Sequence, residues 1–235
     1  MRLTLKTLAA LLGYPTPDLV AAVPEMRAAL DSEGQLPARQ RSRLDRLLED
    51  LATRDLYDLQ ERYVLLFDRS RALSLHLFEH VHGEGRERGQ ALVDLAALYA
   101  GHGLEIGERE LPDFLPLFLE FLSEIPEAEA REHLASPLHV LEAIRQRLKK
   151  RKSVYSSVFS AVAALAKSAP GEDAVNELLA EPDPDPEDFE ALDKAWEDEP
   201  VVFGPGAASA DGCTPGSSLA AKMRAATRLR PAAPH

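Results

Sequence analysis

Three histidines and a glutamate lie within seven residues of one another in the segment SLHLFEHVHGEGRERGQ, at 74–90. His76, Glu79 and His80 have the H-x-x-E-H spacing that marks the zinc site of inverted metalloproteases. In a helix, His76 and His80 would lie one turn apart on one face, as two zinc ligands require. His82 would lie on another face and could join them only where the helix breaks. This spacing raises the hypothesis of a small zinc-dependent hydrolase.

A zinc hydrolase also needs a third protein ligand and a site for an activated water. In the inverted metalloproteases that ligand is a Glu roughly seventy to eighty residues after the motif. In this chain that position falls between Glu142 and Glu172, where there is no Glu. Cys213 is the single cysteine, which excludes an internal disulfide and any zinc site built on several thiolates. No Ser/His/Asp order or pair of catalytic carboxylates stands out either. We therefore expect no enzyme and no metal, and structural histidines at 76–80.

Two acids accompany the apolar stretch ELPDFLPLFLEFL, at 110–122. We predict Asp113 in the first turn of a core helix, where a carboxylate compensates free N–H groups and the helix dipole. Glu120 is the only acid inside that apolar stretch, so it should pair with an Arg or face a groove.

The stretch HGEGRERGQ, at 82–90, combines three glycines with charges of both signs. One interpretation is a solvated turn between two helices, and the other is a polar recognition surface. No strand precedes these glycines, so a nucleotide-binding loop is not supported.

The elements that must position these residues are predicted to be helices. The chain has 38 Leu against three Ile, and γ-branched side chains favour helices whereas β-branched ones favour strands. Apolar residues recur at helical spacing in stretches that end near residue 165. The predicted faces are at 8–12, 19–30, 44–51, 56–67, 92–99, 138–148 and 154–165. The segment 113–125 leaves no polar stripe and is predicted to be a central core helix.

We expect one all-α helical domain at 1–170, followed by an acidic Pro-rich segment at 171–200 and a mostly disordered tail at 201–235. The acidic segment could carry a short helix with Phe189, Leu192 and Trp196. It holds 13 acids and one Lys, out of a net charge of −12 for the whole chain. Such a charge disfavours a nucleic-acid partner and attracts basic peptides.

We expect the protein in the cytoplasm. The apolar N-terminus is interrupted by Lys6 and lacks a cleavage site, so it is not typical of a signal peptide. No apolar run approaches the roughly 20 residues that span a bilayer, and a lone cysteine suits a reducing compartment.

Several of these segments together resemble a known family. They are LLGYP (11–15), YVLLFDR (63–69), SLHLFEHVHGEGRERGQALVDL (74–95), HGL (102–104), ELPDFLPLFLEFLSEIP (110–126) and FGPG (203–206) with Cys213. In order and wording they resemble the nitrate reductase molybdenum cofactor assembly chaperones, the NarJ family, within the TorD-like group of redox enzyme maturation chaperones. The resemblance covers residues 5–165 and extends more loosely to 213.

The resemblance implies a single-domain helical bundle of the TorD-like type, without catalytic activity. It also implies a system-specific chaperone that binds the apo catalytic α subunit of respiratory nitrate reductase through its N-terminal peptide. The client would be held until its cofactor, a molybdenum bis-molybdopterin guanine dinucleotide, is inserted; the chaperone would bind no cofactor stably. A generic helical adaptor remains the alternative to this function, beside the zinc hydrolase.

The resemblance also suggests residues that contact the client. They are Asp113 and Glu120 at a groove, with Ser74, His76, Glu79, His82, Arg86 and Gln90 from the 74–95 block, and the loop 82–90 reading the client. One departure affects this transfer. The wider group usually has a P-D-H triplet where this chain has Pro112-Asp113-Phe114, so no role of that His can be carried over.

Overall fold

The computed structural model describes residues 1–82, 86–107 and 110–183. Within these ranges all regular secondary structure is helical, which confirms the predicted all-α fold class. The α-helices of this part of the chain are α1 (Arg2–Leu11), α2 (Pro17–Ala21), α3 (Val23–Glu33), α4 (Ala38–Thr53), α5 (Leu56–Tyr63), α6 (Glu79–His82), α7 (Arg86–Gly101), α8 (Leu115–Glu124), α9 (Glu127–Ala135), α10 (Leu138–Lys150), α11 (Ser156–Ala166) and α12 (Glu172–Ala180). A π-helical turn at Val64–Asp68 and a 3₁₀ turn at Arg71–Leu73 follow α5.

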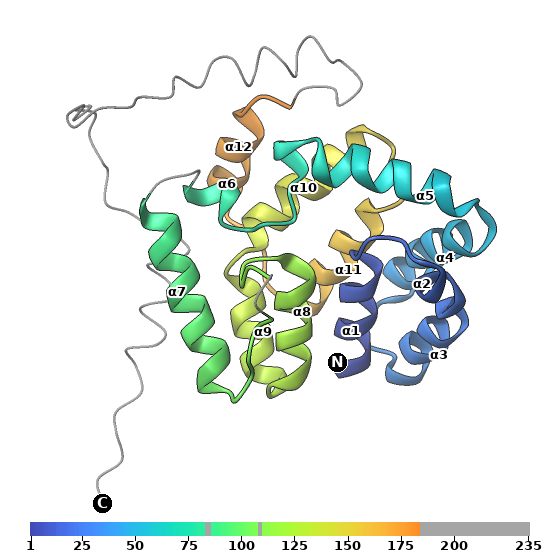
Figure 1. Ribbon diagram of the computed structural model, residues 1–235, viewed down its shortest axis with the longest axis horizontal. Coiled ribbons are helices and arrows are strands. Elements are labelled where there is room, and N and C mark those ends of the chain that lie inside the picture. The colour runs from blue at the N-terminus through green and yellow to red at the C-terminus, as the bar shows by residue number, and fades with distance from the viewer. Residues whose placement is uncertain (83–85, 108–109, 184–235) are drawn as a thin grey trace, which may run out of the picture.

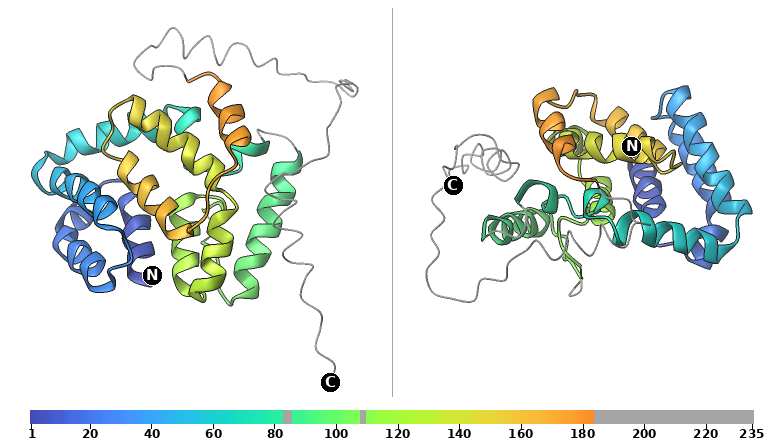
Figure 2. Two further views of the ribbon diagram at one scale, coloured as in Figure 1. Left: turned by 180° about the vertical axis from the view of Figure 1, so that it is seen from behind. Right: turned by 90° about the horizontal axis from the view of Figure 1, so that it is seen from above.

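Helix α1 lies near the centre of the molecule, with α8 beside it on one side and α2, α3 and α4 on the other (Figure 1). Helix α11 packs against α1, α4, α9 and α10, and therefore joins the two halves of the bundle. Helix α7 lies at the edge of the molecule in both Figure 1 and Figure 2. The arrangement leaves one long side of α8 close to α1.

Most of the predicted apolar faces are confirmed as core. Leu44, Leu47, Leu48 and Leu51 of α4 are at most 1% exposed, and the face at 138–148 is equally buried. Their i, i+3, i+4, i+7 spacing places them on one side of a helix, where burial removes apolar surface from water. None of the helices in the described ranges is long and apolar enough to cross a membrane.

Helix α8 differs from its prediction in two respects. It begins at Leu115 rather than at 113, and it carries a stripe formed by the half-buried Leu117 and the exposed Glu120 and Glu124. These three residues follow helical spacing, so they share one face, while Phe118, Leu119 and Leu122 on the other side are fully buried. The prediction of a helix without a polar stripe is therefore wrong.

Helix α12 was not predicted from the sequence. It packs against α10, and it buries Val175 and Leu178. The buried Arg147 of α10 donates hydrogen bonds to the carbonyl oxygens of Ala72 (2.9 Å) and Leu178 (2.5 Å), which ties α12 and the 3₁₀ turn to α10. The helix expected around 189–196 and the predicted tail lie outside the described residues.

The N-terminus of α1 is capped by a side chain from another helix. Glu33, the last residue of α3, accepts hydrogen bonds from the backbone N–H groups of Leu3 (2.8 Å) and Thr4 (2.9 Å) and from the Thr4 hydroxyl (2.7 Å). A helix leaves its first N–H groups without internal partners, so this carboxylate satisfies two of them. Although burial opposes ionisation, these hydrogen bonds lower the pKa of Glu33 to about 2.

We expect Glu33→Gln to lower the free energy of unfolding at pH 7 by roughly 2 kcal/mol, which is less than the pKa shift implies because solvent screens the carboxylate. The folded-state pKa lies below the unfolded value of 4.5, so this stability is present above pH 4.5 and is lost as the pH falls toward 2. Urea unfolding between pH 7 and pH 2.5 should show the two proteins converging at the acidic end. A difference that stays constant with pH would contradict the capping role.

Candidate functional site

The segment 74–78 is not helical, and this changes the interpretation of the histidines. Residue His76 forms an isolated antiparallel bridge with Phe114, and helix α6 begins only at Glu79. The shared helical face that the zinc hypothesis requires of His76 and His80 is therefore not formed. Within the described ranges, no three His, Cys, Asp or Glu side chains are placed to hold a metal ion.

The carboxylate of Asp113 organises this segment. It is fully buried, and its Oδ2 accepts a hydrogen bond from the Phe78 N–H at 3.1 Å. Its Oδ1 lies 3.3 Å from Nδ1 of His76. The backbone adds two further bonds, from Leu77 N to Asp113 O (3.0 Å) and from Leu115 N to Leu75 O (2.8 Å). The prediction that Asp113 lies in the first turn of the core helix is wrong, because its carboxylate binds the 76–78 segment instead of the N-terminus of α8.

Two more residues of the same block hold the segment together. The Ser74 hydroxyl oxygen accepts a hydrogen bond from His76 N (3.2 Å), and the Ser74 carbonyl lies 2.8 Å from Nε2 of His80. A carbonyl can only accept, so His80 carries a proton on Nε2. Burial lowers the pKa of His80 and favours the neutral ring. The Phe114 ring stands 5.3 Å from the His76 ring, centroid to centroid, and completes the packing.

The remaining predicted residues lie on α6 and α7. Arg88 donates a hydrogen bond to Glu79 at 3.0 Å, and the His82 side chain is only 2% exposed, with its ring 5.7 Å from that of Phe78. Gln90 is exposed and donates to Asp94 at 2.8 Å. Arg86 is the first residue of α7, and residues 83–85 of the predicted recognition loop lie outside the described residues.

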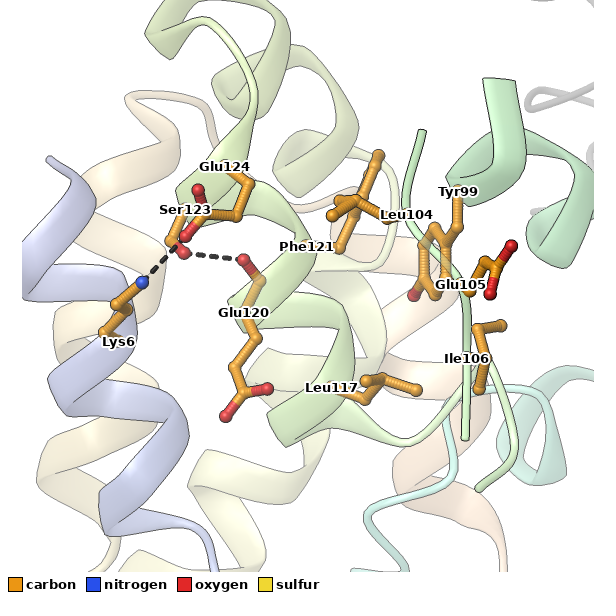
Figure 3. A pocket seen from close by; sticks show the side chains of 10 residues that line it. All are labelled: Lys6, Tyr99, Leu104, Glu105, Ile106, Leu117, Glu120, Phe121, Ser123 and Glu124. Carbon is orange, nitrogen blue, oxygen red and sulfur yellow. Dashed lines mark hydrogen bonds and ion pairs between the residues drawn. The ribbon is translucent and has the colours of Figure 1, made fainter. Parts of the chain in front are cut away.

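A groove of about 360 Å³ opens beside the exposed stripe of α8. Its walls come from α1, α8, the end of α7 and the extended segment 104–106, as Figure 3 shows. The lining residues are Lys6, Tyr99, Leu104, Glu105, Ile106, Leu117, Glu120, Phe121, Ser123 and Glu124. Of the residues predicted for the site, only Glu120 belongs to this lining.

The groove combines apolar surface with carboxylates. Leu104, Ile106 and Leu117 are half-buried, so each keeps apolar surface available to a ligand. Glu124 is bound to Lys6 at 2.7 Å and to Arg2, whereas Glu105 and Glu120 form no ion pair within the described part of the chain. Burial and the nearby Glu110 raise the pKa of Glu120, and Lys6 only partly offsets them. Glu120 therefore lacks the cation that its position favours.

Tyr99 connects the groove to the Asp113 cluster. Its ring lies 4.4 Å from that of Phe121 in the groove lining, and its hydroxyl donates to the carbonyl of Pro112 at 2.7 Å. Burial and the charge of Asp113 raise the pKa of Tyr99, so the hydroxyl stays protonated as a donor. The residue next to Asp113 is thus fixed by a side chain of the groove.

Sequence reasoning missed most of the groove. The helical spacing of Leu117, Glu120 and Glu124 was a usable signal for one wall. The alternation Leu104-Glu105-Ile106 was a signal for the extended segment, because successive side chains of an extended chain point to opposite sides. Lys6 could not be identified, since its place depends on how α1 packs against α8.

The fold has a counterpart among solved structures. The crystal structure of a putative redox enzyme maturation protein from Archaeoglobus fulgidus matches with a TM-score of 0.52, covering 72% of this chain and 94% of that one. At 23% identity this similarity concerns the fold alone.

Sequence comparisons define the family. The nitrate reductase delta subunit family model matches residues 25–161, and the chain belongs to this family. The nitrate reductase molybdenum cofactor assembly chaperone NarJ of Escherichia coli is 45% identical over 193 residues, covering 82% of this chain and 81% of the relative. The probable assembly chaperone NarW of the same organism is 43% identical over 154 residues, or 66% of each chain. The resemblance noted in the sequence is confirmed, and these relatives are chaperones rather than enzymes.

We expect Asp113→Ala to lower the free energy of unfolding by about 2–3 kcal/mol, because a buried hydrogen bond to a charged group is lost and the Phe78 N–H is left unpaired. Hydrogen exchange at Phe78 should accelerate at least about tenfold. Asp113→Asn keeps one oxygen acceptor, so its free energy of unfolding should fall less than that of Asp113→Ala.

The control is Glu120→Ala, whose side chain makes no hydrogen bond or ion pair to the described residues. Its stability should change by less than about 0.5 kcal/mol. Equal effects of Asp113→Ala and Glu120→Ala in denaturant titrations would contradict the role assigned to Asp113.

Proposed function

We propose that this protein is a system-specific chaperone of nitrate reductase assembly. It acts in the cytoplasm, where it binds the catalytic α subunit through that subunit's N-terminal peptide. It holds the subunit until the molybdenum cofactor has been inserted and is absent from the finished enzyme. The cofactor stays with the client, so the chaperone binds none stably. Family membership supports the class of client, and the groove beside α8 supports the mode of binding.

The groove is the observation that carries the peptide-binding step. An amphipathic helix binds a groove by burying its apolar face and placing its polar residues at the rim. Leu104, Ile106 and Leu117 provide the apolar contact surface, and Glu105 and Glu120 provide negative charge beside it. A peptide with a leucine-type apolar face and flanking Lys or Arg side chains matches this lining.

Charge complementarity favours a basic peptide over a neutral one. Glu120 is partly desolvated and has no cationic partner, so a Lys or Arg of the peptide would stabilise its ionised form. Glu124 is already neutralised by Lys6, and we assign it to holding α1 against α8.

Five of the other predicted residues have indirect roles in this proposal. Asp113, Ser74 and His76 position the start of α8, and Glu79 and His82 stabilise the short helix before α7. Arg86 and Gln90, with the loop 82–90, remain predicted to read a further part of the client, because Gln90 is exposed on α7.

In calorimetric titration with a synthetic peptide of the client's N-terminus, Glu120→Gln should weaken binding roughly threefold to tenfold, since one ion pair is lost. Leu117→Ala should weaken it about tenfold through lost apolar contact. Affinity of the wild type should also fall as the pH decreases through the raised pKa of Glu120, because the protonated acid no longer attracts a cation. The pH dependence should be smaller in Glu120→Gln.

Glu25→Gln is the matched control, because Glu25 is an exposed residue of α3 outside the groove and loses the same charge. Its affinity should equal that of the wild type. The assignment of the groove is contradicted if Glu120→Gln and Leu117→Ala bind the peptide with the same affinity as this control.

The cellular role separates a chaperone from a generic helical adaptor. Deleting the gene from cells that produce the nitrate reductase should lower the molybdenum content of the purified reductase, because the subunit is not held open for its cofactor. Supplying the wild type or Glu25→Gln should restore it, and Glu120→Gln should restore it less well. An unchanged molybdenum content after deletion would instead indicate an adaptor.

A further inference from the structure

A second hollow, of about 480 Å³, is lined by six basic side chains. They are Arg39, Arg43 and Arg46 of α4, Arg145 and Lys149 of α10, and Lys152 just after α10. No acid belongs to the described lining, and none of its residues is shared with the groove beside α8. The volume lies in the range of about 300–1,000 Å³ that is usual for small-molecule sites.

The fold brings these charges together at an energetic cost. Arg39, Arg43 and Arg46 are spaced by four and three residues, so they share one face of α4. Arg145 and Lys149 are four apart on α10. Both helices pack against α11, which places the two basic faces around one hollow. Like charges at this spacing destabilise a helix, so the arrangement is not explained by stability.

Few counter-ions accompany this hollow among the described residues, although the protein is acidic overall. Arg145 is paired with Glu142 at 2.6 Å. The other five cations have no ion pair within the described ranges. By contrast, Arg41, on another face of α4, is bound to Asp31 and Asp45. Glu142 also interacts electrostatically with Lys149. Even so, the cations around this hollow outnumber the acids that the described residues offer them, which favours a site for an external anion.

We propose that this hollow binds a small anion that carries a diphosphate group. Arginine forks form paired hydrogen bonds with phosphate oxygens, and lysines add point charge. Five cations are neutralised better by one compact polyvalent anion than by single carboxylates.

Alternative ligands match the lining less well. Val154 is the only apolar side chain among the described lining residues, and none is aromatic, so a peptide or a stacked base finds little contact. An extended polyanion such as nucleic acid would meet the acidic remainder of the protein.

Two of the three serine hydroxyls in the lining of the hollow already donate hydrogen bonds within the protein. Ser156 Oγ donates to the Ser153 carbonyl at 2.8 Å, and Ser157 Oγ donates to the Val154 carbonyl at 2.7 Å. Their protons are therefore already used within the turn before α11. The proposed recognition of the anion therefore depends on the basic side chains, and substitutions that remove their charge can test it.

The test is calorimetric titration of the full chain with inorganic pyrophosphate and, separately, with citrate, an anion of similar charge built from carboxylates. The wild type should bind pyrophosphate more tightly than citrate. The double variant Arg43→Gln/Lys149→Gln should lose about tenfold or more in pyrophosphate affinity. The control Lys150→Gln/Lys167→Gln removes the same charge at exposed positions outside the lining, and it should bind like the wild type.

Circular dichroism and thermal unfolding should show that both double variants keep the fold. Three outcomes would overturn the proposal. They are no binding of pyrophosphate to the wild type, equal affinity for citrate, and equal loss of affinity in the two double variants. Equal loss of affinity in the two double variants would show that pyrophosphate is attracted to positive charge in general and does not bind at a defined site. A GDP titration then distinguishes the source of the diphosphate: an affinity equal to that for pyrophosphate indicates recognition of the free anion, and a tighter one indicates a nucleotide.

Discussion

The candidate site depends on one buried carboxylate. Asp113 has no solvent to stabilise its charge, so the Phe78 N–H and the His76 ring must do so. These two interactions of Asp113 hold the segment 76–78 against the turn before α8, and they fix the residue at which α8 begins. The start of a helix sets the direction of every side chain on it. The exposed stripe of α8 therefore faces the groove because Asp113 is held in place.

The distribution of charge gives the two hollows opposite characters. Beside α8, carboxylates accompany apolar side chains. Among the described residues, Glu124 forms ion pairs with Arg2 and Lys6, whereas Glu105 and Glu120 form none. Between α4 and α10, cations accompany polar side chains, and within the described ranges Arg145 is the only one of these cations in an ion pair. Elsewhere on α4, Arg41 is paired with acids of α3 and α4, so uncompensated charge is not a general property of this surface. It is concentrated where a ligand could supply the missing partner.

The sequence was sufficient for the fold class and for most of the core, because leucines at helical spacing report a buried face directly. It failed at 74–78, where the H-x-x-E-H spacing is compatible with a helix but the chain forms a bridge and a turn held by Asp113, 35 residues from Phe78. It also failed for Lys6 and the 104–106 wall, whose positions are set by tertiary packing. Helix α12 was missed because the acids at 171–200 concealed the two apolar residues that dock it.

Tyr99 belongs to both parts of the site, since its ring packs on Phe121 in the groove and its hydroxyl holds the carbonyl next to Asp113. Two events that act on one side chain are thermodynamically linked, and the linkage is reciprocal. A ligand that packed against Tyr99 in the groove would also stabilise the turn before α8. Under the proposed function, a change that loosens this turn would therefore also weaken binding in the groove. The segment 76–78 could thus influence binding without touching the ligand.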